Sequence, residues 1–271
     1  MPFPSNFHLN HEVQRPFLYE RTDRPYLVSY VGSSNSYLPT ATKMRREMLK
    51  FCTLHSADCT HSPYNKNGDR EPELANGGEN AHYKYSLKSV FCLQPIGDLP
   101  TRKGLFDAIV FGCIPVVFHP LSASAMYTWH WPTELWKDIA IEIPMNMVDR
   151  DKPILFSDPI QHLKDLLEKE PQNVAQRQKL LREHAFELSY SLEFYQTGSG
   201  NWPVDEKNRP IRDAYEITMD TLLSLNSGKY SLEPRLFEKS WKEDIKNMVF
   251  EKGVRDFNAA LKRAEERKKI G

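Results

Sequence analysis

The chain has 271 residues and carries 36 Lys and Arg residues against 36 Asp and Glu residues, so its formal net charge is zero. Hydrophobic residues make up 40% of the chain and charged residues 27%, which is ordinary globular usage and argues against a disordered or collagenous protein. The zero charge argues against a protein that binds nucleic acid by a general attraction to phosphates. The length suits one large domain or about two average ones.

The sequence shows neither a recognisable targeting signal nor a membrane-spanning segment. No stretch approaches about 18 uninterrupted apolar residues, and residues 1–17 lack the basic start and apolar centre of a signal peptide. We therefore expect a soluble, cytoplasmic protein without a membrane span. Its four cysteines (Cys52, Cys59, Cys92 and Cys113) form no Cys-x-x-Cys pair and are too few for a disulfide scaffold of this size. We expect all four to be reduced, free thiols.

Short apolar segments alternate with amphipathic ones in the first part of the chain. The predicted strands lie at 26–31, 89–93, 114–118 and 138–143. The helices predicted between them lie at 40–51, 81–88 and 101–111, and a long polar loop is predicted over 55–79. Strands separated by helices of about ten residues predict an α/β protein with a parallel sheet covered on both faces.

The rest of the chain has an almost wholly helical pattern. Helices are predicted at 158–169, 173–195 and 210–225, followed by a charged helical pair from 232 to 269. We divide the chain into an N-terminal arm (1–23), a ligand-binding domain (24–226) and a C-terminal helical extension (227–271).

Residues 89–118 form the segment with the clearest chemistry, a predicted strand, loop, helix and strand. The loop carries Gly97 and Asp98, and the helix is predicted to open with Pro100, Thr101 and Arg102. A helix that begins just beyond the carboxyl end of a strand offers unpaired N–H groups and a positive dipole end to an anion. Thr101 adds a hydroxyl and Arg102 a guanidinium that can hold phosphate through two hydrogen bonds. The segment therefore predicts a phosphate site.

Asp107 follows on the same predicted helix, and two interpretations of it stay open. Its carboxylate can accept hydrogen bonds from the vicinal hydroxyls of a ribose. Alternatively, it pairs with Lys103, which lies four residues earlier and therefore on the same helix face.

The string FCLQPIGDLPTRKGLFDAIVFGCIPVVF (91–118) resembles the core of the exostosin-like glycosyltransferases, glycosyltransferase family 47. The resemblance extends backward to RPYLVSYVGS (24–33) and forward to the helices before residue 226. Short relatives are also carried by large DNA viruses of algae, which suggests a viral origin. The resemblance implies a Rossmann-like parallel sheet, like the donor-binding lobe of the two-lobed GT-B arrangement, and sugar transfer with inversion.

The family resemblance also implies the substrates and raises the question of the second lobe. We expect a UDP-sugar donor, a glycan or glycoprotein acceptor, and no nucleic-acid partner. Only about 23 residues precede the matching part, where an acceptor-binding lobe needs about 100 or more. We expect that lobe to be missing, reduced, or rebuilt from residues 1–23, the 55–79 loop and the extra C-terminal helices.

Further site residues follow from position and family together. Gly32 and Ser33 end the first strand, where a turn lets the backbone approach a phosphate, and helical phase puts Arg45 rather than Arg46 on the inner side. His119 follows the 114–118 strand. The predicted nucleotide-sugar site comprises Gly32, Ser33, Arg45, Gly97, Asp98, Thr101, Arg102, Asp107 and His119.

Inverting transfer needs a general base, and the polar loop and N-terminal arm offer several carboxylates. The candidates are Asp69, Glu71, Glu73, Glu79, Glu12 and Asp23. We nominate Asp69, because Asn67-Gly68 can turn its backbone inward.

The function predicted from the sequence is inverting, metal-independent transfer of a sugar, with xylose favoured, from a UDP-sugar to a glycan. No cofactor or bound metal is expected. One alternative is a non-catalytic exostosin-like scaffold or sugar-binding subunit. Another is a metal-dependent transferase that uses Asp149 and Asp151, whose D-x-D spacing suits a hard divalent cation.

Overall fold

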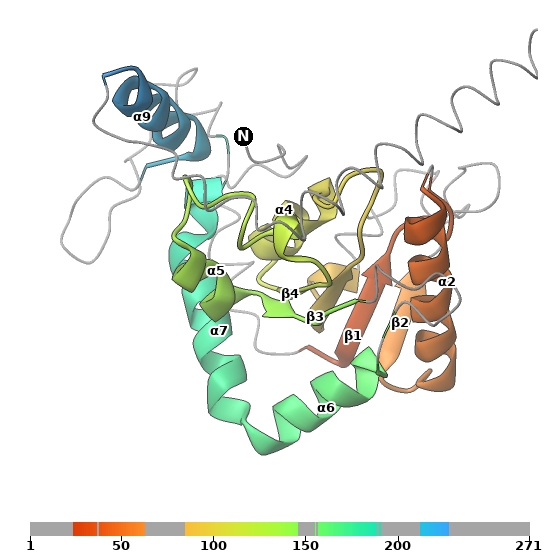
Figure 1. Cartoon of the computed structure of the whole chain (residues 1–271). Helices are drawn as coiled ribbons and strands as arrows, with labels where there is room; N and C mark the ends of the chain where they lie inside the picture. The colour runs from red at the N-terminus through yellow and green to blue at the C-terminus, as the bar shows by residue number, and fades with distance from the viewer. Residues whose placement is uncertain are drawn as a thin grey trace, which may run out of the picture.

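The computed structural model describes residues 24–36, 38–62, 85–145, 155, 157–188, 190 and 212–227. Its centre is a five-stranded sheet in the order β2-β1-β3-β4-β5, in which every neighbouring pair is parallel (Figure 1). The strands are β1 Tyr26–Val31, β2 Cys59–Ser62, β3 Ser89–Gln94, β4 Ile114–Val117 and β5 Ile141–Glu142. This sheet confirms the predicted α/β class.

Helices flank the sheet and continue beyond it (Figure 1). They are α2 Pro39–Leu54, α4 Lys103–Val110, α5 Thr133–Ile139, α6 Pro159–Lys169, α7 Pro171–His184 and α9 Ala214–Asn226, with short 3-10 turns η2 Pro120–Ser122 and η3 Ala185–Leu188. Helix α2 contacts β2 and α6, α4 contacts β3 and β4, and α7 contacts β4 and α5. None of the helices in the described ranges is long and apolar enough to cross a bilayer.

The strand order places a topological switch between β1 and β3. From β1 the chain crosses through α2 to the edge strand β2, and the next strand, β3, lies on the other side of β1. The α4 crossover from β3 to β4 then runs in the opposite direction along the sheet. Because such crossovers are right-handed, α2 and α4 cover opposite faces. Ligands of open parallel sheets bind at the carboxyl ends of the strands where the order reverses.

Burial explains why the central strands were recognisable from the sequence. Strand β4 is buried throughout, and β3 is buried except at Val90. Helix α4 is buried from Gly104 to Val110, because it packs between the sheet and η3. The rings of Trp131 and Trp136 lie 4.6 Å apart between centroids and close the core beside α5.

The structure differs from the predicted elements mainly where polar residues build short strands. Strand β2, with the sequence CTHS, lies inside the segment predicted as a loop, because an edge strand of four mostly polar residues has no apolar alternation. The strand predicted at 138–143 is only Ile141–Glu142, since α5 extends to Ile139. Of the helix predicted at 81–88, residues 85–88 are described and contain no α-helix.

The prediction of free thiols is wrong for all four cysteines. Cys52 of α2 is bonded to Cys59 of β2, and Cys92 of β3 is bonded to Cys113, which precedes β4. The Cα atoms of the two pairs are 5.0 and 5.8 Å apart, within the range that a disulfide requires. The sequence hid both pairs, because parallel packing brings together residues that lie 7 and 21 positions apart.

Candidate functional site

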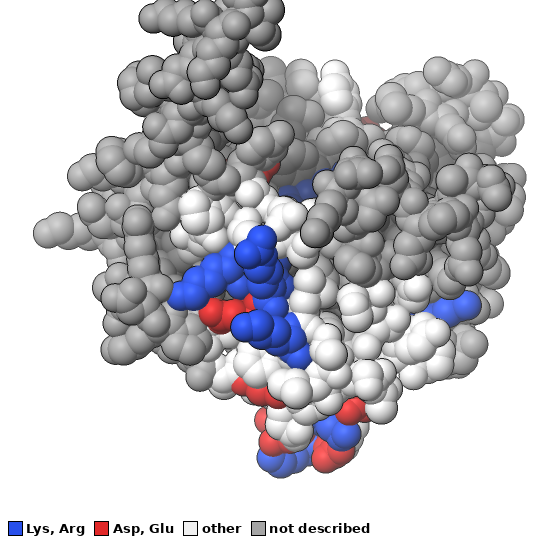
Figure 2. All heavy atoms as spheres, turned by 90° about the vertical axis from the view of Figure 1, so that its right-hand side faces the viewer, with Lys and Arg blue, Asp and Glu red and all other residues white. Residues whose placement is uncertain are grey.

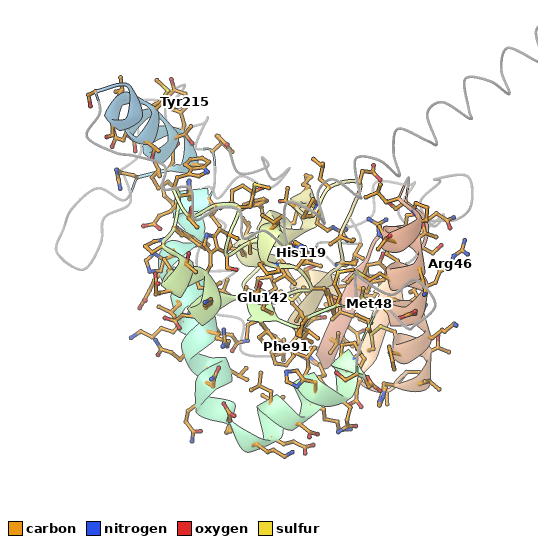
Figure 3. The ribbon with its side chains drawn as sticks, in the orientation of Figure 1. Arg46, Met48, Phe91, His119, Glu142 and Tyr215 are labelled. Carbon is orange, nitrogen blue, oxygen red and sulfur yellow. A yellow bond between two sulfur atoms is a disulfide. The ribbon has the colours of Figure 1, made fainter. Side chains whose placement is uncertain are left out.

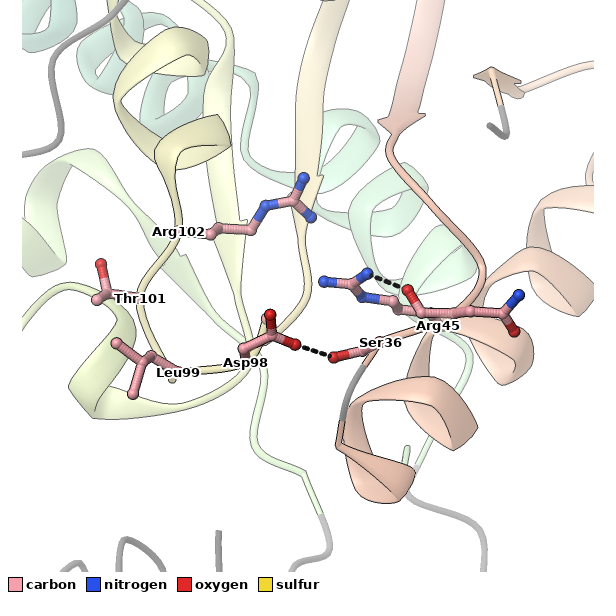
Figure 4. A pocket seen from close by; sticks show the side chains of 8 residues that line it. Ser36, Arg45, Asp98, Leu99, Thr101 and Arg102 are labelled. Atoms are coloured by element: carbon pink, nitrogen blue, oxygen red, sulfur yellow. Dashed lines mark hydrogen bonds between the residues drawn. The ribbon is translucent and has the colours of Figure 1, made fainter. Parts of the chain in front are cut away.

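A cavity of about 550 Å³ opens at the carboxyl ends of β1 and β3, at the topological switch of the sheet (Figure 4). Its volume lies within the roughly 300–1,000 Å³ of small-molecule sites. It is lined by Asn35, Ser36, Arg45, Gly97, Asp98, Leu99, Thr101 and Arg102. Five of these residues belong to the predicted nucleotide-sugar site: Arg45, Gly97, Asp98, Thr101 and Arg102.

Arg45 joins the two loops that form the walls of the cavity. Its Nη1 donates to the carbonyl oxygens of Ser33 (3.2 Å) and Asn35 (2.8 Å) in the loop after β1. Its Nε donates to the carbonyl oxygen of Ile96 (3.2 Å) in the loop after β3. The guanidinium therefore fixes the distance between the two loops through their backbones.

The position of Arg45 on α2 agrees with the helical phase read from the sequence. Arg45 is 9% exposed, and its burial lowers the pKa of the guanidinium. Its neighbour Arg46 points outward, and its Nη2 donates to Asn35 Oδ1 at 3.0 Å (Figure 3). One arginine of the pair thus faces the cavity, and the other lies on the outer side of α2.

Arg102 provides the second guanidinium of the cavity (Figure 4). Its Nη2 donates to the carbonyl oxygen of Val31 at 3.2 Å, which anchors the side chain on the end of β1. Its Nη1 is buried and has no hydrogen-bond partner among the described residues. A buried N–H group without a partner is rare in folded proteins and marks a place where a ligand or water completes the hydrogen bonding.

Gly32 makes room for this guanidinium at the end of β1. Its φ of 155° is accessible chiefly to glycine, and a Cβ at this position would lie 3.1 Å from Arg102 Nη2. The hydroxyl of the neighbouring Tyr30 donates to the carbonyl oxygen of Ser33 at 2.7 Å, and burial raises the pKa of Tyr30. Gly32 and Ser33 therefore shape the wall beside Arg102.

Thr101 lies at the other side of the cavity, in the loop before α4. Its Oγ1 is 2.6 Å from the hydroxyl of Tyr127, and burial raises the pKa of that tyrosine. Helix α4 begins at Lys103, two residues later than predicted, so Thr101 and Arg102 precede the helix. The first N–H groups of α4 still follow directly on the cavity-lining residues, so the helix dipole adds positive potential there.

The charges around the cavity suit an anion. Its lining includes two guanidinium groups, from Arg45 and Arg102, and one carboxylate, from Asp98. Figure 2 shows a group of Lys and Arg side chains on the side of the molecule where α2 lies. Outward positions of that helix are occupied by Arg46 and Lys50. Such a surface attracts an approaching anionic ligand.

The cavity lining leaves out four predicted site residues: Gly32 and Ser33, described above, and Asp107 and His119. Asp107 has a side chain that is 2% exposed, and Lys103 Nζ donates to its two carboxylate oxygens at 2.8 and 2.7 Å. The local ion pair that the sequence left open is therefore formed. His119 is buried beyond the end of β4, where its Nδ1 accepts from the backbone N–H of Leu121 at 3.1 Å.

The residues predicted as general base or as metal ligands belong to parts of the chain that the structure does not describe. Asp69, Asp149 and Asp151 lie outside the described residues. Glu142, at the carboxyl end of β5, was not singled out from the sequence; its oxygens accept from Ser124 Oγ at 3.3 Å, and burial raises its pKa. Within the described ranges, no three His, Cys, Asp or Glu side chains converge as metal ligands would.

The cavity also includes residues that the sequence analysis did not select. Asn35, Ser36 and Leu99 line it, and Leu99 stands 57% exposed at its edge. The sequence predicts the loop after the first strand. Which of its residues face the cavity depends on the hydrogen bonds from Arg45 that hold the loop.

Comparison with known proteins shows which family this chain belongs to. The sequence profile of the Exostosin GT47 domain matches residues 1–157. A probable xyloglucan galactosyltransferase of Arabidopsis thaliana, GT19, is 27% identical over 229 residues, covering 82% of this chain and 48% of the relative. The xyloglucan-specific galacturonosyltransferase 1 of the same plant is 36% identical over 136 residues, covering 49% of this chain and 18% of the relative.

A third relative, the xyloglucan galactosyltransferase MUR3 of Arabidopsis thaliana, is 32% identical over 140 residues, covering 49% of this chain and 20% of that protein. The chain thus spans about half, or less, of the length of these curated relatives. The profile match covers more than half of the chain and includes β1 to β5 with the whole cavity lining. The chain belongs to the exostosin family of glycosyltransferases, GT47.

Proposed function

We propose that this chain binds a UDP-sugar in the cavity between β1 and β3 and supports transfer of the sugar to a glycan acceptor with inversion. The observation that carries the proposal is the pair of guanidinium groups at the topological switch of a GT47 sheet. The buried Nη1 of Arg102, without a partner among the described residues, supports a diphosphate there. Arginine is well suited to phosphate oxygens, because its planar fork can donate two parallel hydrogen bonds.

In this proposal the chain's own groups neutralise the leaving UDP. Arg102, the Thr101 hydroxyl and the positive end of α4 lie together beside the cavity, and Arg45 adds a second positive charge. Positioned cations and N–H donors can stabilise the charge that develops on a departing phosphate. We therefore propose transfer without a divalent metal. For the general base we retain Asp69, as the sequence suggested.

The names of the relatives change the donor sugar that we propose. The sequence favoured xylose, but the relatives are named as galactosyl- and galacturonosyltransferases of xyloglucan. We therefore rank UDP-galactose and UDP-galacturonic acid ahead of UDP-xylose, and a xyloglucan-like glycan as the first acceptor to test.

The two disulfides indicate the redox state of the compartment in which the protein folds. Disulfides persist in oxidising compartments and are rare in the cytosol. Cys52–Cys59 and Cys92–Cys113 therefore favour an oxidising compartment over the cytoplasm that the sequence suggested.

Calorimetric titration with UDP tests the binding step, and saturable heat is the expected result. No binding at millimolar UDP would remove the proposal. Release of UDP from the three UDP-sugars, with and without a xyloglucan oligosaccharide, then separates an enzyme from a non-catalytic scaffold, which binds UDP without turnover. Full activity in EDTA is expected, and a strict requirement for Mn²⁺ would favour the alternative that uses Asp149 and Asp151.

A further inference from the structure

The guanidinium of Arg102 lies in a slot between two glycines. A Cβ on Gly32 would lie 3.1 Å from its Nη2, and a Cβ on Gly104, in the first turn of α4, would lie 3.1 Å from its Nε and 3.2 Å from its Nη2. Contacts this short are tighter than ordinary packing, so a side chain at either position would press on the guanidinium. Two glycines from different elements therefore set the place of Arg102.

A third residue faces the same space. Gln94, the last residue of β3, is 6% exposed, and its Oε1 would lie 2.6 Å from a Cβ on Gly104. The missing side chain of Gly104 thus lets the Gln94 oxygen and the Arg102 guanidinium occupy neighbouring positions. Among the described residues, neither Gln94 Oε1 nor Arg102 Nη1 has a hydrogen-bond partner, although both atoms are buried.

A buried acceptor and a buried donor without partners are costly, and here both belong to side chains that approach Gly104. On the basis of the proposed function, we propose that Gln94 is a positioning residue for Arg102. When a diphosphate occupies the cavity, the Gln94 oxygen accepts a hydrogen bond from the guanidinium, while Val31 O holds its Nη2. The remaining N–H groups then point at the phosphate oxygens. Arginine has five N–H donors, enough for all three partners.

The amide of Gln94 suits this role better than a carboxylate would. A glutamate at this position would form an ion pair with Arg102 and cancel the charge that attracts the diphosphate. The neutral amide oxygen orients the guanidinium and leaves its positive charge available to the ligand.

A double-mutant cycle measures whether Gln94 acts through Arg102. UDP affinity is measured by calorimetry for the full chain, Gln94→Met, Arg102→Ala and the double variant. Methionine keeps the length of the side chain and removes the acceptor. We expect Gln94→Met to weaken UDP binding about tenfold in the parent and less than twofold in the Arg102→Ala background. Gln161→Leu, an exposed position on α6, is the matched control and should bind UDP like the parent.

Every outcome of the double-mutant cycle either supports or overturns the role of Gln94. Equal weakening in both backgrounds, or none in the parent, overturns the role of Gln94 while UDP binding by the parent still supports the proposed function. Absence of UDP binding by the parent removes both. If Gln94→Met does not fold, Gln94→Asn replaces it, because the shorter side chain keeps the polar amide but withdraws its oxygen from the guanidinium. The same dependence on Arg102 is expected, with about tenfold weaker binding in the parent.

Discussion

Ser36 donates a 2.7 Å hydrogen bond to Oδ1 of Asp98 across the cavity, from the loop after β1 to the loop after β3 (Figure 4). The two loops follow β1 and β3, which are neighbours in the sheet and end at Val31 and Gln94, 63 positions apart in the sequence. The carboxylate of Asp98 is therefore held between the two loops, in the lining of the cavity that we propose binds the nucleotide-sugar.

Asp98 gives the first prediction. Asn at this position can still accept from Ser36 but removes a negative charge beside the proposed diphosphate site. We expect Asp98→Asn to bind UDP as tightly as the parent or several-fold more tightly, because a repulsion is lost. If Asp98 contacts the sugar hydroxyls, sugar transfer should fall at the same time. Titrations with UDP alone and with the UDP-sugar separate the two effects, and weaker binding of UDP itself would contradict this assignment.

The second prediction concerns Arg102. Replacing it with Ala removes a charged donor from the cavity, and we expect UDP binding to weaken by about 1.5–3 kcal/mol. Arg182→Ala, an exposed position on α7, is the control and should leave UDP binding unchanged. Calorimetry on the three proteins makes the comparison. An Arg102→Ala variant that binds UDP like the parent would show that the guanidinium does not contact the diphosphate.

The third prediction concerns the disulfides. Closing the 21-residue separation between Cys92 and Cys113 should stabilise the fold by about 3 kcal/mol, and the shorter Cys52–Cys59 loop by somewhat less. Reductant should therefore lower the unfolding temperature, and the single variants Cys92→Ser and Cys52→Ser should separate the two contributions. Thiol titration under denaturing conditions should find no reactive thiol before reduction. Four reactive thiols would contradict the pairing.

The fourth prediction concerns His130. Its Nε2 lies 2.7 Å from the carbonyl oxygen of Glu187 and so donates to it, and burial lowers the pKa of the ring to about 4. Since the unfolded chain binds a proton near pH 6.5 and the folded one only near pH 4, stability is lost as the pH falls between these values. The loss should be about 2 kcal/mol at pH 5 relative to pH 7.

The control for that titration is His130→Gln, which keeps a donor but does not titrate. The nearby His184 has a raised pKa, because it bonds to the Glu187 carboxylate, so its contribution to stability is fully present below about pH 6.5 and is lost as the pH rises through its folded pKa. The difference between parent and His130→Gln isolates His130. Equal pH dependence of unfolding in the two proteins would rule out a buried neutral ring.

The parts of the fold that could be predicted are those where the sequence is apolar and continuous. The strand at 26–31 was predicted with the bounds of β1, and the 89–118 segment predicted β3, α4 and β4 closely, because buried parallel strands read as unbroken apolar runs. The cavity residues of that segment followed from their place after a strand.

The remaining features depend on contacts between distant segments. Strand β2 is polar and short, and only its pairing with β1 reveals it. The partners of Cys52 and Cys92 depend on the same packing. Nothing local marks Gln94 as a neighbour of Arg102, since the two are brought together by the return of the chain from β3 into α4.

The hydrogen bonds of Arg45 have a consequence for how this site can change. All three of its partners, at Ser33, Asn35 and Ile96, are backbone carbonyl oxygens. The part of the loop spacing that Arg45 sets therefore does not depend on the side chains of these three residues. On the proposed function, substitutions at Ser33, Asn35 or Ile96 would leave these three hydrogen bonds in place, so these positions are favourable for redesigning the choice of donor sugar.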